Sequence, residues 1–190
     1  MLVLASASPR RQELLRNAGI PFVAQPSDIP EDAQPGESPE TCAQRLAREK
    51  ALAILQLRPD DFVLGADTIV VIDSQMLNKP ESATDAARML RLLSGHTHKV
   101  ITGVCLVGRK ESVPSFVDVR IETTKVSMSE ISDREIQDYI STGEPMDKAG
   151  AYAIQGIASR WITRIEGDYC NVVGLPIALV YRMLKEHQVF

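Results

Sequence analysis

The chain has 190 residues, of which 44% are hydrophobic, and its 21 Lys and Arg against 25 Asp and Glu residues give a net charge of −4. This size and composition indicate a single soluble domain over residues 1–190, and the negative charge argues against a protein that acts mainly on duplex nucleic acid. The scattered cysteines Cys42, Cys105 and Cys170 form no Cys-x-x-Cys pair, so we expect a reducing compartment and no cysteine zinc site. No apolar leader and no apolar run of about 20 residues occurs, which favours a cytoplasmic location without a membrane partner.

The chain begins with a short apolar strand at residues 2–5, followed by a helix. Ser8 suits the N-cap and Pro9 the first helical position, so Arg10 and Arg11 fall in the first turn. Cations oppose the helix dipole at this end, yet a strand, a small-residue loop and a helix N-terminus commonly bind phosphate. The two arginines therefore either hold an anion or extend into solvent.

An acidic loop and a second helix come next. The loop at residues 26–32 contains Glu31, which is of interest only as a source of metal-binding oxygens. A helix is expected from residue 38 to about residue 57, with apolar residues along one face at 3.6-residue spacing. Lys50 falls inside this apolar stripe, so its ammonium either extends outward to solvent or emerges in a pocket that holds anions.

The strand predicted at residues 62–72 is apolar on both faces, which is typical of a buried strand. Asp67 lies in its middle, and a carboxylate there is unfavourable unless it is paired, hydrogen-bonded or bound to a cation. Asp67 is thus either a satisfied structural acid or a functional one. Lys79 follows on a short connection, because a residue that precedes proline is disfavoured in a helix.

Helical and extended patterns alternate in the rest of the chain. His96 and His98 are expected in a turn, and without a nearby acid they are a weak metal signal. In the second of two long strands, apolar and polar residues alternate, which predicts a ribbon with one solvated face. The expected elements are a helix at 82–93, strands at 99–107 and 117–126, a helix at 132–140, a strand at 158–165 that returns through 169–173, and a helix from 175.

The segment at residues 144–156 is rich in small residues, which allow a ligand to approach the backbone closely. Gln155 lies near its end, between Ile154 and Gly156. The amide of Gln155 offers both donors and an acceptor, so it can read the edge of a base, and it can equally be a plain strand residue.

Charged residues at unusual positions form one coherent set. Lysines and arginines beside carboxylates that hold a hard metal ion suit phosphoryl chemistry on a polyphosphate, where catalysis is mostly positioning and charge neutralisation. A binder of single-stranded nucleic acid fits poorly, because the chain has one Trp, four Tyr and four Phe residues and no basic stripe. The set consists of Arg10, Arg11, Lys50 and Lys79, with the carboxylates of Asp67 and Glu31.

Seven motifs are spread along essentially the whole chain. They are Leu-Ala-Ser-Ala-Ser-Pro-Arg-Arg-Gln-Glu-Leu-Leu (4–15), Arg-Leu-Ala-Arg-Glu-Lys-Ala (45–51), Gly-Ala-Asp-Thr (65–68), Lys-Pro (79–80), Leu-Ser-Gly-His-Thr-His (93–98), Asp-Lys-Ala-Gly-Ala-Tyr-Ala-Ile-Gln-Gly (147–156) and Val-Val-Gly-Leu-Pro (172–176). In content and order they resemble the motifs of the Maf-like nucleoside triphosphate pyrophosphatases.

This resemblance implies an α/β fold with an elongated, twisted mixed sheet flanked by helices, in two lobes around a central cleft, of the ITPase-like kind. It implies hydrolysis of a nucleoside triphosphate between the α and β phosphates, with a divalent cation, Mg or Mn, and a cytoplasmic location. A homodimer is expected at the family level. The alternative that the family suggests is a nucleotide-binding regulator of septum formation with little or no turnover.

The resemblance also assigns roles to individual residues. Asp67 matches the proton acceptor, either as a direct base or through a metal that it would hold together with Glu31. Ser6, Arg11, Lys50 and Lys79 match phosphate-binding positions. The positions linked to base selection are Arg10, Thr68 and Gln155.

The three base-selection positions also distinguish branches of the family. A sibling branch that prefers 7-methyl-GTP has tryptophan, glutamine and glutamate there, which suits a cationic base. Arg10, Thr68 and Gln155 resemble the branch that acts on dTTP and UTP, since a neutral amide can pair with the O4 and N3–H edge of thymine or uracil.

Overall fold

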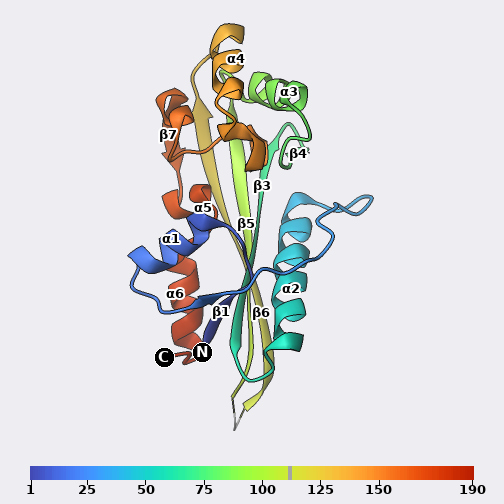
Figure 1. The fold of residues 1–190 in the computed structure, drawn as a ribbon, viewed down its shortest axis with the longest axis vertical. Coiled ribbons are helices and arrows are strands. Elements are labelled where there is room, and N and C mark those ends of the chain that lie inside the picture. The colour runs from blue at the N-terminus through green and yellow to red at the C-terminus, as the bar shows by residue number, and fades with distance from the viewer. Residues whose placement is uncertain (111–112) are drawn as a thin grey trace. The chain divides into compact units, whose positions relative to one another are not determined.

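The computed structural model describes residues 1–110 and 113–190, with backbone alone for residues 109–110 and 113–115. Helices and strands alternate along most of the chain (Figure 1). The α-helices are α1 (Pro9–Asn17), α2 (Pro39–Leu57), α3 (Ala83–Leu93), α4 (Asp133–Ser141), α5 (Tyr169–Val173) and α6 (Ile177–Glu186), with short 3₁₀ helices at η1 (Glu144–Asp147), η2 (Ala149–Ala151) and η3 (Ile157–Trp161). The strands are β1 (Leu2–Leu4), β2 (Val23–Ala24), β3 (Phe62–Ile72), β4 (Gln75–Leu77), β5 (Thr97–Lys110), β6 (Val113–Met128) and β7 (Ile162–Glu166).

The strands form a seven-stranded mixed sheet in the order β2-β1-β3-β5-β6-β7, with β4 paired to β3. β1 is parallel to both β2 and β3, whereas the pairs β3–β4 and β6–β7 are antiparallel. The expected α/β class, a mixed sheet flanked by helices, is confirmed. None of the described helices has the length and hydrophobicity needed to span a membrane.

The chain forms two compact units. The first contains residues 1–68, 102–122 and 174–190, and the second contains residues 69–101 and 123–173. The long strands β3, β5 and β6 contribute residues to both units.

In the first unit, the side chains of β3 alternate between two helical layers. Val63 packs with α2 residues such as Ala47 and Ile54, and the side chains of even-numbered residues lie on the opposite face. A β-carbon at Gly65 would lie 2.2 Å from the carbonyl oxygen of Ala47. Only glycine therefore lets the backbone of α2 approach β3 this closely, two residues before Asp67.

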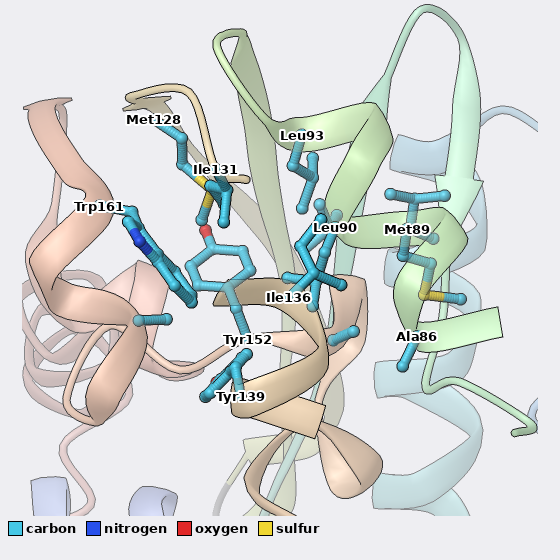
Figure 2. Close-up of a cluster of buried hydrophobic side chains, with 14 of the residues drawn as sticks. Ala86, Met89, Leu90, Leu93, Met128, Ile131, Ile136, Tyr139, Tyr152 and Trp161 are labelled. Atoms are coloured by element: carbon cyan, nitrogen blue, oxygen red, sulfur yellow. The ribbon is translucent and has the colours of Figure 1, made fainter. Parts of the chain in front are cut away.

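The core of the second unit lies between α3, α4 and the sheet (Figure 2). Leu90 of α3 and Ile136 of α4 are completely buried, and the ring of Tyr139 meets Trp161 edge-on at 5.3 Å between ring centroids. A capping box between Ser132 and Glu135 begins α4 and satisfies backbone N–H groups at the helix N-terminus.

Two strand predictions near the C-terminus are wrong. Residues 157–161 form the 3₁₀ helix η3, in which Trp161 is buried, and the strand begins only at Ile162. Residues 169–173 are not a returning strand but the short helix α5, because a carboxylate oxygen of Asp168 accepts the backbone N–H of Asn171. Burial and a local side-chain cap therefore outweighed the β-branched composition.

The two long strands β5 and β6 form the predicted ribbon, but the face of β6 that is exposed to solvent carries apolar residues. Val117 and Ile121 of β6 are 46% and 36% exposed. Asp118 and Arg120, on the other face, are partly buried and pair with His187 and Glu186 at the end of α6. The polar face was expected to be solvated, but this helix covers it and supplies ion partners.

His98 lies in β5, not in a turn, and its ring is 2% exposed. Nε2 is 2.7 Å from the hydroxyl of Tyr152, and Nδ1 has no hydrogen-bond partner in the described part of the chain. Burial lowers the pKa of His98 to about 4, since protonation would place a charge and an unsatisfied N–H in the core.

This burial predicts a pH-dependent stability. In the unfolded chain His98 binds a proton below about pH 6.5, whereas in the folded protein it does so only below about pH 4. The free energy of unfolding should therefore fall as the pH drops from 6.5 to 4. The contribution of His98 is about 2 kcal/mol between roughly pH 7 and pH 5. Urea unfolding of the wild type and of His98→Gln at both pH values should show a smaller decrease in the variant, and equal decreases would contradict the prediction.

Candidate active site

The centre of the candidate site is an ion triad in the first unit, in which Lys50 and Asp67 are buried and Glu31 is exposed. Lys50 of α2 is 6% exposed, and its Nζ lies 2.7 Å from Oδ1 of Asp67 and 2.6 Å from Oε1 of Glu31. Asp67 is 8% exposed and faces α2 from the middle of β3. The two charges that the sequence places in apolar surroundings therefore pair with each other, and the ammonium of Lys50 does not extend to solvent.

Glu31 reaches this centre from a segment without helix or strand, which a second ion pair holds in place. Both carboxylate oxygens of Glu37 accept N–H groups of Arg45, at 2.7 and 2.8 Å, and Arg45 also donates to the carbonyl oxygen of Asp32 at 2.9 Å. The hydrogen bond from Arg45 lowers the pKa of Glu37 to about 2. Arg45 thus fixes the backbone next to Glu31 against α2.

Sequence reasoning assigned no role to Arg45. The available signal was its position at the start of the motif at residues 45–51, one helical turn and a half before Lys50. Its partner Glu37 lies in the loop before α2, and sequence spacing alone does not show that pairing.

The carboxylates of Glu31 and Asp67 fit a hard divalent cation. Both contact the same ammonium nitrogen, so the two carboxylates lie close to each other in the site. Within residues 1–110 and 113–190, no cluster of three or more His, Cys, Asp or Glu residues forms a metal cage. Mg²⁺ is usually held by one or two carboxylates together with substrate phosphates, which matches this donor set.

Arg11 joins several segments on the other face of β3. Its Nε donates to the carbonyl oxygen of Gly174 at 2.7 Å, and its terminal nitrogens donate to the carbonyl of Ala66 at 2.9 Å, to Thr68 Oγ1 at 3.0 Å and to Ser6 Oγ at 3.3 Å. Burial lowers its pKa, while Asp67 and Glu31 act in the opposite direction.

Strand pairing and a local helix cap together place Arg11. Registered pairing of β1 with β3 ends at Leu64, so the carbonyl of Ala66 lies beyond the last registered pair and is available to Arg11. The helix α1 begins as predicted, because Ser8 Oγ accepts the backbone N–H of Arg11 and Pro9 is the first helical residue. Four of the five N–H donors of a guanidinium are thereby directed to protein acceptors.

Asp67 and Thr68 are adjacent in β3 and therefore point to opposite faces of the sheet. Asp67 meets Lys50, whereas Thr68 Oγ1 lies 2.9 Å from Thr102 Oγ1 and donates to the carbonyl of Gly174 at 3.3 Å. Gly174 adopts φ of +127°, which favours glycine and directs its carbonyl to both Arg11 and Thr68. A strand can thus carry an acid and a proposed specificity residue side by side without mutual contact.

The predicted site residues are divided between the two units. Arg10 lies in the first turn of α1, in the same unit as Ser6, Arg11 and the residues of the ion triad. Lys79 and Gln155 belong to the second unit, and both are exposed. Gln155 lies at the tip of a turn that a hydrogen bond closes, from the N–H of Gly156 to the carbonyl of Ala153 at 3.1 Å.

Comparison with known proteins identifies the family. Residues 1–187 match the family described as Maf-like protein. The chain belongs to this family. A dTTP/UTP pyrophosphatase of Koribacter versatilis (strain Ellin345) is 62% identical over 184 residues, which cover 97% of this chain and 93% of the relative. A dTTP/UTP pyrophosphatase of Geobacter sp. (strain M21) is 50% identical, with 97% and 94% covered.

A solved structure is also similar in part. The nucleoside-triphosphatase / dITP/XTP pyrophosphatase of Mycobacterium abscessus aligns with 68% of this chain and 73% of its own, at 15% identity and a TM-score of 0.45.

The hydrogen bonds of Arg11 predict that even lysine cannot replace it. Arg11→Lys keeps the charge but loses most of the four bonds, so the free energy of unfolding should fall by about 3 kcal/mol. Arg16→Lys, on the exposed part of the same helix, is the matched control and should change it by less than about 0.5 kcal/mol. Equal urea midpoints for the two variants would refute the role of Arg11.

Proposed function

We propose that this Maf-like protein hydrolyses dTTP and UTP to the nucleoside monophosphate and pyrophosphate, and so clears nucleotides from the pool. The observation that carries the proposal is the ion triad of Lys50, Asp67 and Glu31, because it brings a positive charge and two carboxylates together at one point. The names of the near-full-length relatives support the choice of substrates.

The reaction follows from the roles of these side chains. A water oxygen forms a bond to the α phosphorus, the bond from that phosphorus to the bridging oxygen breaks, and pyrophosphate leaves with the electron pair. Asp67 accepts the proton of the attacking water. Lys50 neutralises charge beside Asp67. Arg10, Arg11, Ser6 and Lys79 are proposed to bind phosphate oxygens.

Mg or Mn is the proposed cofactor, held by Glu31 and Asp67. When bound, it would neutralise charge on the phosphates and polarise them toward attack. Lys50 contacts both carboxylates and keeps them together. Removal of divalent ions with a chelator should therefore abolish turnover without unfolding the protein.

Base selection is proposed to depend on Arg10, Thr68 and Gln155. The exposed amide of Gln155 can pair with the O4 and N3–H groups of uracil and thymine. Thr68 is held in place by Arg11, Thr102 and Gly174, so its contribution would be rigid. The cytoplasmic location and a homodimer remain predictions.

Replacing the proposed base tests the catalytic role. Asp67→Asn should lower pyrophosphate release from dTTP by about 10³-fold or more, since it removes the proton acceptor, while circular dichroism and nucleotide binding persist. Asp73→Asn, at the exposed turn after the same strand, is the matched control and should retain activity. Unchanged turnover of Asp67→Asn would refute the role of Asp67.

The same assay separates the enzyme from a binding regulator. Tight nucleotide binding by the wild type without pyrophosphate release from any common or modified nucleotide would favour a regulator of septum formation.

Specificity has a test of its own. Gln155→Glu places a negative charge where the base would present its O4 acceptor, so kcat/KM for dTTP and UTP should fall about tenfold or more. Gln137→Glu, an exposed change of the same kind in α4, should leave both values unaltered. A variant at residue 155 that retains the wild-type pyrimidine preference would contradict the base-reading role.

A further inference from the structure

A carboxylate in the second unit holds the turn that presents Gln155. Glu144 begins η1, and its Oε1 accepts the hydroxyl of Tyr139 at 2.9 Å and the backbone N–H of Ile157 at 3.1 Å. Its second oxygen also lies within hydrogen-bond distance of that N–H, at 3.3 Å. The turn at Ala153–Gly156 ends immediately before Ile157, so Glu144 holds the backbone at the C-terminal end of the turn.

Two neighbouring side chains hold Glu144 in place. The hydroxyl that it accepts belongs to Tyr139, which is 1% exposed and packs edge-on against the buried ring of Trp161 (Figure 2). Burial and the bond to Glu144 raise the pKa of Tyr139, so its hydroxyl stays protonated and donates. The backbone of Glu144 is held as well, since Lys148 donates to its carbonyl oxygen at 2.6 Å.

Gly156 leaves room for this carboxylate. A β-carbon at residue 156 would lie 2.1 Å from Oε1 of Glu144, although its backbone φ of −104° is open to any residue. Glycine is therefore needed at this position because the carboxylate lies against the backbone, one residue after Gln155. The side chain of Gln155 is exposed at the tip of the turn.

We infer that Glu144 is a positioning residue for base selection: it fixes the turn at Ala153–Gly156, and thereby the direction in which Gln155 presents its amide to a pyrimidine base. The inference rests on the proposed reading of the base by Gln155. An amide can read the edge of a base only if it lies within hydrogen-bond distance of that edge, and a rigid turn backbone keeps the amide of Gln155 at a fixed place. Glu144 supplies that rigidity without contact to the nucleotide.

The test compares binding of dTTP and dCTP, whose pyrimidine rings present opposite donor and acceptor patterns. Glu144→Gln should lower the ratio of the two affinities, measured by calorimetric titration, about tenfold, because a neutral amide oxygen accepts more weakly than a carboxylate and its NH2 group cannot replace the oxygen that lies 3.3 Å from the Ile157 N–H. Gly156→Ala should give the same loss by displacing the carboxylate. Asp138→Asn, an exposed acid in α4, is the matched control and should keep the wild-type ratio.

A double-mutant cycle separates positioning from a general structural effect. In a Gln155→Ala background, Glu144→Gln should cause no further loss of selectivity, since the residue through which it acts is absent. A further loss of equal size there would overturn the inference. Hydrogen exchange gives a readout independent of the nucleotide, because the Ile157 amide should lose protection in Glu144→Gln. Unchanged protection would also overturn it.

The outcomes distinguish this inference from the proposed function. Selective binding of dTTP without pyrophosphate release would refute the proposed hydrolysis, while the affinity ratios would still measure the effect of Glu144. Pyrophosphate release with an unchanged affinity ratio in Glu144→Gln would refute the role of Glu144 alone. Equal affinities for dTTP and dCTP in the wild type would refute base reading by Gln155, and this inference with it.

Discussion

The ion pair between Lys50 and Asp67 is the interaction on which the first unit depends. Either charge alone would be costly, because Asp67 lies in an apolar strand and Lys50 on the apolar face of α2. Their pairing requires the backbone of α2 to approach β3, and Gly65 permits that approach two residues away. The contact that pairs these two buried charges also places an acid and a cation side by side in the candidate site. The close packing of α2 on β3 is therefore needed both for stability and for the proposed chemistry.

Irregular segments carry much of the remaining chemistry, and in each a charged side chain replaces the rigidity that regular structure would give. Arg45 ties the loop of Glu31 to α2, and Arg11 joins the loop of Ser6 to β3. Glu144 does the same for the turn of Gln155. Hydrogen bonds to charged groups are stronger than neutral ones, which suits them to hold loops that bury little apolar surface.

Much of the architecture was predictable from local patterns. The strand at residues 62–72, the helix from Pro39 to Leu57 and the Ser8 cap follow from periodicity and capping chemistry, and the structure confirms all three. The failure at α5 has a local cause, the cap of Asp168, whereas two others occur where partners distant in sequence decide the outcome. Trp161 is buried in the core of the second unit, and its segment forms a 3₁₀ helix instead of a strand. In the first unit, α6 covers the polar face of β6.

The sequence by itself determined the fold class, the family and the identity of the unusual charges, because composition, spacing and motifs are properties of the chain alone. Only the tertiary structure decided which charges pair. Asp67 and Thr68 are neighbours in sequence yet face opposite layers, whereas Lys50 and Asp67 are 17 residues apart and in contact. The reason is physical: a strand alternates its side chains between two faces, and the packing of helices on each face selects their partners.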